Sequence, residues 1–451
     1  MDPFLCLAAL LPLASLLLLL LRGWPVGRAA AACCLLAAGG GLAWFDGSIW
    51  LLAEAALLGS RHAIPIISVV FLTLLLYAWA ERSGALRRLQ QLLAGCSADR
   101  TVQALVIGWL FVHVLQGISG FGVPVLVGAP LLLKVGLAPA RAVIIALLGQ
   151  CWGNTFGTLG LAWDGMMQQV MLAPPAAGTA LWLASSYLLL VCIATGWGIA
   201  WLAGGWQGFR RTFWLVLLLG IVQGEGQTIL AAWNPELANL LASLLGLGAF
   251  LLIRSLQIRR KQRFVACPPQ AGFAGDGAAA GCITWLQPEA LPGCLRYACR
   301  RTWPVAISIL LLLILSEIMA VTGQTRALAS GLAAVAGSRY LAAASLVGLL
   351  GSFMTASNLS SNILFASFQQ QMAVLLQLAP AKLLALQTAG GAVGTLLSPS
   401  NILLGTTAAG IAGREREVLR ATLPAALLLA SGFGLLALAA EVVNQNWTPR
   451  G

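Results

Sequence analysis

Charged side chains are scarce in this chain of 451 residues, of which only 9% are Asp, Glu, Lys or Arg and 59% are hydrophobic. An ordinary soluble protein devotes roughly a quarter of its residues to these four types, so this composition excludes a water-facing surface of the usual kind. There are only two histidines, and no spaced His, Asp and Glu cluster or nucleophile with a neighbouring base, which argues against an enzyme. A Gly-x4-Gly-Lys-Ser/Thr motif is also missing, which argues against ATP-driven pumping by this chain alone.

Apolar runs of about twenty residues are abundant, and this is the length that a helix needs to cross a hydrocarbon core of roughly 30 Å. The runs are too long and too rich in Leu and Ala for barrel strands, so we predict helices. The fold class is therefore all-α integral membrane, with about 12 to 14 transmembrane helices, some of them broken. Spans are expected near residues 4–21, 28–45, 62–80, 101–118, 119–135, 141–160, 180–203, 213–232, 237–253, 303–321, 340–356, 358–376, 383–410 and 421–441. The short apolar pieces 48–59 and 326–336 are predicted to be interfacial or re-entrant, and whether they span stays open.

Basic residues outnumber acidic ones by 26 to 14, which gives a formal net charge of +12. They gather in seven short loops between apolar runs, so the charge indicates membrane topology and not a nucleic-acid site. The opposite loops carry Asp164 and Glu236 instead, and both ends of the chain are predicted to face away from the cytoplasm. The ten cysteines match no zinc spacing, so we expect no metal and no cofactor, and we assign no role to the loop cysteines, which are Cys267, Cys282, Cys294 and Cys299.

A weak internal repeat divides the chain. The sequence Leu-Ala-Pro-Ala-Arg at 137–141 recurs as Leu-Ala-Pro-Ala-Lys at 378–382, and Gly149 and Gly153 recur as Gly390 and Gly394, each at an offset of 241 residues. An odd number of predicted spans separates the copies, so the halves should have inverted topology, a common build for secondary transporters. We expect N-terminal scaffold spans (1–100), a first core repeat (101–160), further scaffold spans (161–255), a polar cytoplasmic loop (256–301), a second core repeat (302–413) and a C-terminal span (414–451).

Each half contains two stretches too polar and too rich in glycine for a lipid-facing helix. They lie at 116–124 and 149–155 in the first half, and at 355–362 and 390–401 in the second. Irregular backbone at this depth survives only where it is buried in protein or lines water, and a helix that begins at such a break directs its positive dipole end into the cavity. One break alone is explained as well by close helix packing. Four breaks in two related halves indicate a shared site for an anion such as a carboxylate.

The segment Gly117-Ile118-Ser119-Gly120-Phe121-Gly122-Val123-Pro124 resembles the glycine-rich signature of the L-lactate permease family. Residues 355–362, Gly390-Gly391 and Ser398-Pro399 resemble the second-half signature of that family. The resemblance implies a multi-pass protein of the bacterial inner membrane that imports L-lactate, D-lactate or glycolate with protons. Three positions depart from the pattern, because Gln116 stands where the family usually has Glu, Asn358 where it has Asp, and Thr395 where it has Lys.

The candidate substrate-binding residues come from the four breaks: Gln116, Ser119, Gly120, Phe121, Gly122, Asn154, Thr155, Ser357, Asn358, Ser360, Ser361, Asn362, Ser398 and Asn401. An amide cannot carry a proton as a carboxylate can, so the coupling residue is sought elsewhere. Glu317 and His113 are the candidates at membrane depth, although Glu317 fits an interface position equally well and a lone His is more often a packing residue.

The leading function is a secondary transporter for a short 2-hydroxy-monocarboxylate. A carrier for a different small organic anion, with altered or no proton coupling, is the alternative, followed by a channel-like or structural membrane subunit. The expected partners are the anion, a coupling ion (a proton in the leading reading) and the lipid bilayer. Whether the chain forms a homo-oligomer stays open.

Overall fold

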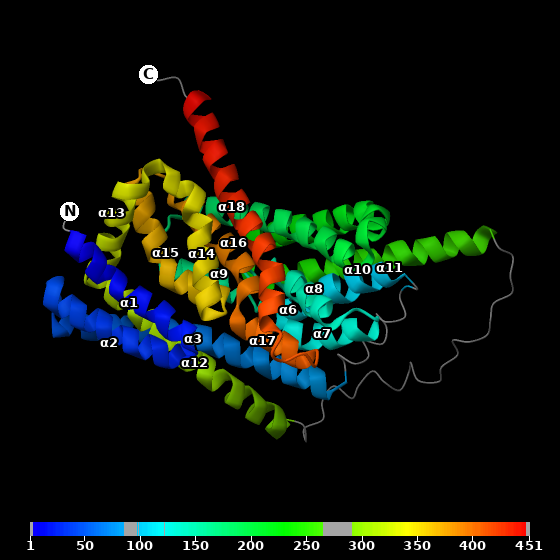
Figure 1. Cartoon of the computed structure of the whole chain (residues 1–451), viewed down its shortest axis with the longest axis horizontal. Helices are drawn as coiled ribbons and strands as arrows, with labels where there is room; N and C mark the ends of the chain where they lie inside the picture. Colours follow the sequence, from blue (N-terminus) through cyan, green and yellow to red (C-terminus); the bar gives the residue numbers. More distant parts are fainter. Residues whose placement is uncertain (1–2, 85–96, 98, 121, 265–290, 448–451) are drawn as a thin grey trace.

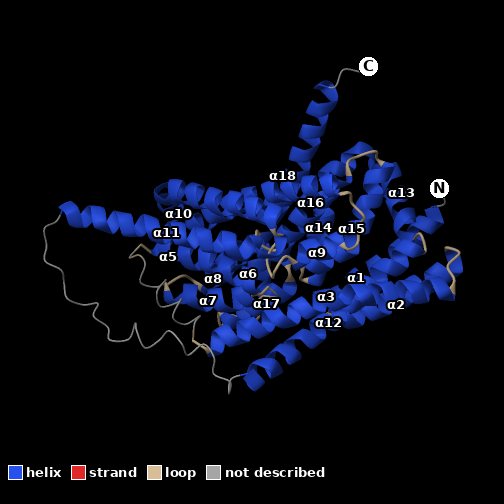
Figure 2. Cartoon of the chain, turned by 180° about the vertical axis from the view of Figure 1, so that it is seen from behind, coloured by secondary structure: helices blue, strands red, loops and turns tan. Residues whose placement is uncertain are grey.

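The computed structural model describes the whole chain except residues 1–2, 85–96, 98, 121, 265–290 and 448–451. All regular structure in the described part is helical (Figure 2). Nine helical stretches there are long and apolar enough to cross a membrane, which identifies a multi-pass membrane protein. Two of these stretches each consist of two helical segments. Gly205 divides the longest stretch, and a 3₁₀ turn divides the stretch Gln324–Thr355.

Four long helices form a scaffold on one side of the molecule, where the blue ribbons of Figure 1 lie beside the yellow-green one. They are α1 (Pro3–Leu21), α2 (Val26–Trp44), α3 (Ile49–Arg82) and α12 (Leu291–Val321). α12 packs along both α2 and α3.

The predicted division between 48–59 and 62–80 is wrong, because both pieces belong to the single helix α3. The polar run Ser60-Arg61-His62, at the junction of the two predicted pieces, continues the helix. Ser48 starts the helix by accepting a hydrogen bond from the backbone N–H of Leu51 at 3.2 Å. Gly59 lets α12 approach, since a Cβ there would lie 2.9 Å from the backbone nitrogen of Ile314.

The first core repeat alternates helices with breaks. Its elements are α5 (Arg100–Leu105), the π-helical stretch η1 (Val106–Phe111), α6 (Val112–Ile118), α7 (Val123–Lys134), α8 (Pro139–Cys151) and α9 (Leu161–Met167). The predicted break before residue 123 is present, and Gly122 adopts φ +81° there. The predicted span 141–160 is instead a helix that ends at Cys151, followed by a series of turns, because glycines at 153, 157 and 160 interrupt it.

Two helices follow the first core repeat. α10 (Pro174–Trp233) bends sharply at Gly205, whose φ of 60° and ψ of −156° are not helical, so it comprises the two spans that the sequence predicts. Asn234 then starts α11 (Pro235–Phe264), accepting hydrogen bonds from the backbone N–H groups of Glu236 and Leu237. The expected polar loop at 256–301 is shorter than predicted, because α11 runs to Phe264 and α12 begins at Leu291.

The second core repeat follows α12 and the short helix α13 (Gln324–Ala336). Its elements are the 3₁₀ turn η3 (Gly337–Arg339), α14 (Tyr340–Thr355), α15 (Asn358–Leu375), α16 (Pro380–Gly394), the 3₁₀ turn η4 (Thr395–Leu397) and α17 (Pro399–Ala408). The final helix is α18 (Glu415–Trp447). The predicted span 383–410 is therefore broken at 395–398, where the polar Ser-Pro-Ser-Asn motif had indicated a break.

The two repeats follow the same plan and meet at the centre of the molecule. α8 and α16 both begin with a proline, Pro139 and Pro380, at equivalent positions. α6, α7 and α8 lie on one side of the centre and α14 and α15 on the other (Figure 1). α7 and α8 contact α17, and α9 contacts α15, so each broken segment of one half packs against the other half.

Equivalent glycines in the two halves permit the closest helix approaches. A Cβ at Gly149 would lie 1.7 Å from the carbonyl oxygen of Gly108, and a Cβ at Gly390 would lie 1.9 Å from that of Ser345. These atoms are backbone and cannot rotate away. Small residues at both positions are therefore required for the packing of α8 and α16.

We predict that Gly390→Ala destabilises the fold, because overpacking of this kind costs about 1 to 3 kcal/mol. The measurement is the melting temperature of the purified protein in detergent. Gly432→Ala is the matched control, since a Cβ at this α18 glycine meets nothing within 4 Å. Equal melting temperatures for the two variants would contradict the predicted role of Gly390.

Candidate functional site

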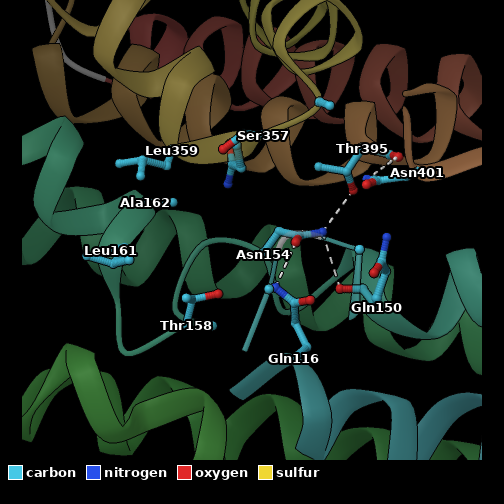
Figure 3. A pocket seen from close by; sticks show the side chains of 15 residues that line it. Gln116, Gln150, Asn154, Thr158, Leu161, Ala162, Ser357, Leu359, Thr395 and Asn401 are labelled. Carbon is cyan, nitrogen blue, oxygen red and sulfur yellow. Dashed lines mark hydrogen bonds between the residues drawn. The ribbon is translucent and has the colours of Figure 1, made fainter. Parts of the chain in front are cut away.

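The four breaks enclose a small cavity of about 40 Å³ between the two core repeats (Figure 3). None of the 15 residues that line it is charged. From the first repeat the lining residues are Gln116, Gly120, Gly122, Gln150, Asn154, Gly157, Thr158, Leu161 and Ala162, and from the second Ala356, Ser357, Asn358, Leu359, Thr395 and Asn401. A cavity of this size holds a few water molecules, and amides and hydroxyls dominate its polar groups.

Asn154 links the two halves across the cavity. Its Oδ1 accepts a hydrogen bond from Nε2 of Gln116 at 2.9 Å, and its Nδ2 donates to Oγ1 of Thr395 at 2.8 Å. Figure 3 shows Asn154 between these two side chains. Asn154 and Thr395 stand at equivalent positions of the internal repeat, because 241 residues separate them. Because equivalent positions of the two halves touch here, the pair lies on or near the axis that relates the halves.

A second polar cluster surrounds Thr388, on α16. Asn358 donates to Oγ1 of Thr155 at 3.2 Å, and Asn362 donates to Oγ1 of Thr388 at 2.9 Å. The hydroxyls of Thr155 and Thr388 lie 3.1 Å apart. Oδ1 of Asn358 and Oδ1 of Asn362 are buried but accept no hydrogen bond from any described residue. Asn358 lines the cavity, and its Oδ1 is an acceptor with no partner among the described residues.

Glycine makes room for this arrangement at Gly391. A Cβ there would lie 2.1 Å from Oδ1 of Asn358, so any larger residue would displace the amide from the cavity wall. The two adjacent glycines thus have different roles. Gly390 allows the backbone of α14 to pack closely against α16, and Gly391 leaves room for the side chain of Asn358.

Three helices of eight or more residues begin at the cavity wall. α7 starts after Gly122, and α15 starts after Ser357, whose Oγ accepts from the backbone N–H of Ser360 at 3.4 Å. α17 starts after Ser398, whose Oγ accepts from the backbone N–H of Asn401 at 3.3 Å. The positive ends of three helix dipoles therefore converge on an uncharged space, and they favour a negatively charged occupant.

Seven of the candidate binding residues line the cavity: Gln116, Gly120, Gly122, Asn154, Ser357, Asn358 and Asn401. Thr155 and Asn362 stand behind it in the Thr388 cluster, and Ser361 donates to the carbonyl of Gly348 at 2.9 Å. Ser119 is buried without lining the cavity, Ser398 caps α17, and Ser360 lines a different groove. Phe121 lies outside the described residues.

Sequence reasoning missed three polar residues of the site, namely Gln150, Thr158 and Thr388. Gln150 stands inside a break that was recognised, but Thr388 lies within an otherwise apolar helix. Its signal was the polar pair Gln387-Thr388 in that apolar run. Gln387 also participates, since its Nε2 donates to Oγ of Ser361 at 3.1 Å.

The two proton-coupling candidates lie outside the cavity. His113 is fully buried and stacks on Trp152 with ring centroids 3.5 Å apart. Its Nε2 lies 2.7 Å from Nδ2 of Asn239. Glu317 on α12 has its Oε1 3.2 Å from Nδ1 of His62 on α3. The preceding residue, Ser316, donates to Oε1 of Gln169 at 2.9 Å and to the carbonyl of Ile363 on α15. The Glu317–His62 pair therefore stands where the scaffold meets the core.

The described residues contain no group of three or more His, Cys, Asp or Glu that could hold a metal ion. Of the four loop cysteines, Cys294 is buried and Cys299 exposed, both on α12, while Cys267 and Cys282 lie outside the described residues.

Comparison with known proteins gives one consistent result. Residues 6–268 and 280–443 match the family model described as L-lactate permease. An L-lactate permease of Halalkalibacterium halodurans is 26% identical, and the alignment covers 82% of this chain and 83% of that protein. The glycolate permease GlcA of Escherichia coli is 22% identical, covering 83% and 84%. Among solved structures, the YdaH transporter of Alcanivorax borkumensis matches with a TM-score of 0.46 and 17% identity, over 84% of this chain and 85% of that one.

We predict that Thr395→Val destabilises the protein by about 1 kcal/mol, because it removes the hydrogen bond that Nδ2 of Asn154 donates to the other half. Unfolding in detergent, followed by tryptophan fluorescence, measures the change. Thr407→Val is the matched control, since Thr407 is exposed on α17. A Thr395 variant as stable as this control would show that the link between the halves contributes nothing.

Proposed function

Because the chain belongs to the L-lactate permease family, we propose that it is a secondary transporter that imports a short 2-hydroxy-monocarboxylate, such as L-lactate or glycolate, with protons. The observation that carries this proposal is the uncharged, donor-rich cavity at which the broken helices of both halves meet. We place the protein in the bacterial inner membrane, in keeping with its bacterial relatives.

The cavity suits a carboxylate that has to be released again. Side-chain amides of Gln116, Gln150 and Asn401 supply N–H donors, and three helix dipoles favour negative charge. None of the lining residues is Lys or Arg, so no ion pair would hold the anion in place. Transport requires a site that is favourable enough to enter and weak enough to leave.

The 2-hydroxyl of the substrate also finds suitable partners. Asn154, Asn358 and Asn401 each offer an amide, which both donates and accepts hydrogen bonds. The Oδ1 of Asn358 is the best acceptor for this hydroxyl, because it is buried and has no partner among the described residues. A site built to bond a hydroxyl discriminates strongly against an analogue without it, since the polar group is then left unpaired.

Movement of the halves would open the cavity. At about 40 Å³ the cavity is small, and hydrogen bonds such as that from Asn154 to Thr395 join the two halves across it. Exchange of these bonds for bonds to the substrate would let one half shift relative to the other. The substrate would then face the two sides of the membrane in turn.

Proton coupling belongs at a site other than the cavity, because Gln116, Asn358 and Thr395 are neutral where ionisable groups were expected. The Glu317–His62 pair is the best candidate among the described residues. An ionisable pair at membrane depth is costly and usually functional. The hydrogen bonds of Ser316 connect its helix to α15, through Ile363, and to the segment that follows α9, through Gln169, so a change in protonation could alter how the core moves.

The neutral cavity also favours a second candidate, a carrier for another small organic anion without proton coupling. Purified protein in liposomes separates the two. Accumulation of labelled L-lactate or glycolate under an imposed pH gradient supports the first proposal, and uptake unaffected by the gradient supports the second. No uptake of either acid would refute the proposed substrate class.

We predict that Asn358→Ala reduces uptake of labelled L-lactate to background while insertion and size-exclusion behaviour stay normal. The variant removes an amide that lines the cavity and donates to Thr155 of the other half. Gln371→Ala, on the same helix and half-exposed, is the matched amide truncation and should transport normally. Wild-type uptake by the Asn358 variant would exclude it from the binding site.

We predict that Glu317→Gln abolishes accumulation driven by a pH gradient but preserves exchange of internal for external lactate. Exchange needs substrate binding and movement, whereas accumulation also needs a proton to bind and leave. Glu225→Gln, an exposed acid on α10, should leave both activities unchanged. Full gradient-driven accumulation by the Glu317 variant would remove this residue from the coupling mechanism.

A further inference from the structure

A second, larger hollow adjoins the cavity. This groove has a volume of about 560 Å³, within the roughly 300 to 1,000 Å³ typical of small-molecule sites. Its walls are the start of α2, the segment of α12 from Pro304 to Leu311, the end of α14, the start of α15 and the start of α17. It thus lies between the scaffold and the second core repeat.

The groove and the cavity share three lining residues: Ala356, Ser357 and Asn401. These residues therefore border both the small polar cavity and the larger groove. Two of the three belong to the break between α14 and α15, and Asn401 stands at the start of α17. No other lining residue is common to both hollows.

The shared wall contains strained backbone. Ala356 has φ +62°, a left-handed conformation that an L-residue with a Cβ adopts at a cost. Ser357 follows with an extended conformation, and α15 begins at the next residue. A two-residue link between helix ends can absorb a large change of direction, and strain stored there is typical of switch regions.

The groove has one charged residue, Arg28, and no acidic one. Arg28 is exposed and takes part in none of the ion pairs found among the described residues. Hydroxyls of Ser308, Ser360 and Ser400 add polar points to a wall that is otherwise mainly apolar. An unpaired guanidinium at the mouth of a low-dielectric groove raises the local concentration of anions. This favours a small carboxylate over a neutral lipid chain as the occupant.

We infer that this groove is the passage between the cavity and one side of the membrane, with Arg28 attracting the substrate carboxylate and the Ala356–Ser357 link and Asn401 forming the gate. The inference rests on the proposed transport function. The charge distribution predicts that the side concerned is the cytoplasm, because Arg28, at the start of α2, stands with Arg22 in one of the basic segments that the sequence assigns to that side. Ser360, expected in the binding site, belongs to this passage instead.

The test narrows the groove from opposite walls. Ser400→Trp places an indole on the α17 side and Ala31→Trp places one on the α2 side, so that one variant serves if the other fails to fold. Each should lower lactate uptake in liposomes by about tenfold or more, as expected when a transport step is blocked. Leu428→Trp, at an α18 residue that is 75% exposed, is the control for an added indole and should transport normally.

Arg28→Gln tests whether Arg28 attracts the substrate anion, separately from whether the groove is the passage. We expect KM for lactate to rise about threefold to tenfold at low salt with little change in kcat, and the difference to shrink at high salt, because exposed charges are screened. Arg22→Gln removes a charge six residues away, outside the groove, and should have little effect.

The outcomes are distinct. Wild-type protein that moves no hydroxy acid refutes the proposed function, and the passage with it. Wild-type protein that transports, together with Trp variants that fold and transport at the wild-type rate, refutes the passage alone. An Arg28 variant with a wild-type KM at low salt refutes the role given to Arg28.

Discussion

The constraint on which this structure depends is that backbone freed from a helix inside a membrane must be satisfied by protein. Breaks after Ile118, Cys151, Thr355 and Gly394 interrupt the helices of both halves. Side-chain oxygens of Ser357 and Ser398 meet the freed N–H groups of the following helices. Side-chain amides then join the broken segments of the two halves, from Asn154 to Thr395 and from Asn362 to the carbonyl of Ala162. The cavity lies where these segments meet, so several residues that satisfy the breaks also line the proposed binding site.

Much of this could be predicted because the signals were local. Glycine, proline and amides inside apolar runs identified the breaks, and half of the candidate residues line the cavity. The misses were long-range. Thr388 belongs to the site only because α16 lies beside α15, and no pattern near Glu317 pointed to His62, which is far away in sequence. The error at 48–59 had a different cause, since a polar run can remain in a helix when glycine allows a neighbouring helix to come close.

The distribution of charge places the proposed substrate site and the proposed proton-coupling site in different parts of the structure. The cavity is neutral, and the proposed coupling pair, Glu317 and His62, lies at the junction between scaffold and core. In this arrangement the anion and the proton would not compete for one group. They would act on each other through the position of α12 relative to α15 and to the segment that follows α9, both of which accept hydrogen bonds from Ser316. Coupling would then be mechanical, through two arrangements of one packed interface.

The contact of Asn154 with Thr395 has a consequence for energetics. In a protein whose halves were identical and inverted, a two-fold axis in the membrane plane would relate the conformations open to each side, and their free energies would be equal. A residue facing its own repeat equivalent would then preserve that degeneracy only if both were the same. Here an amide donates and a hydroxyl accepts, so the pair is polarised along one direction. The halves therefore differ at the point where their equivalent positions touch, and nothing in this contact requires the two orientations to have equal free energy.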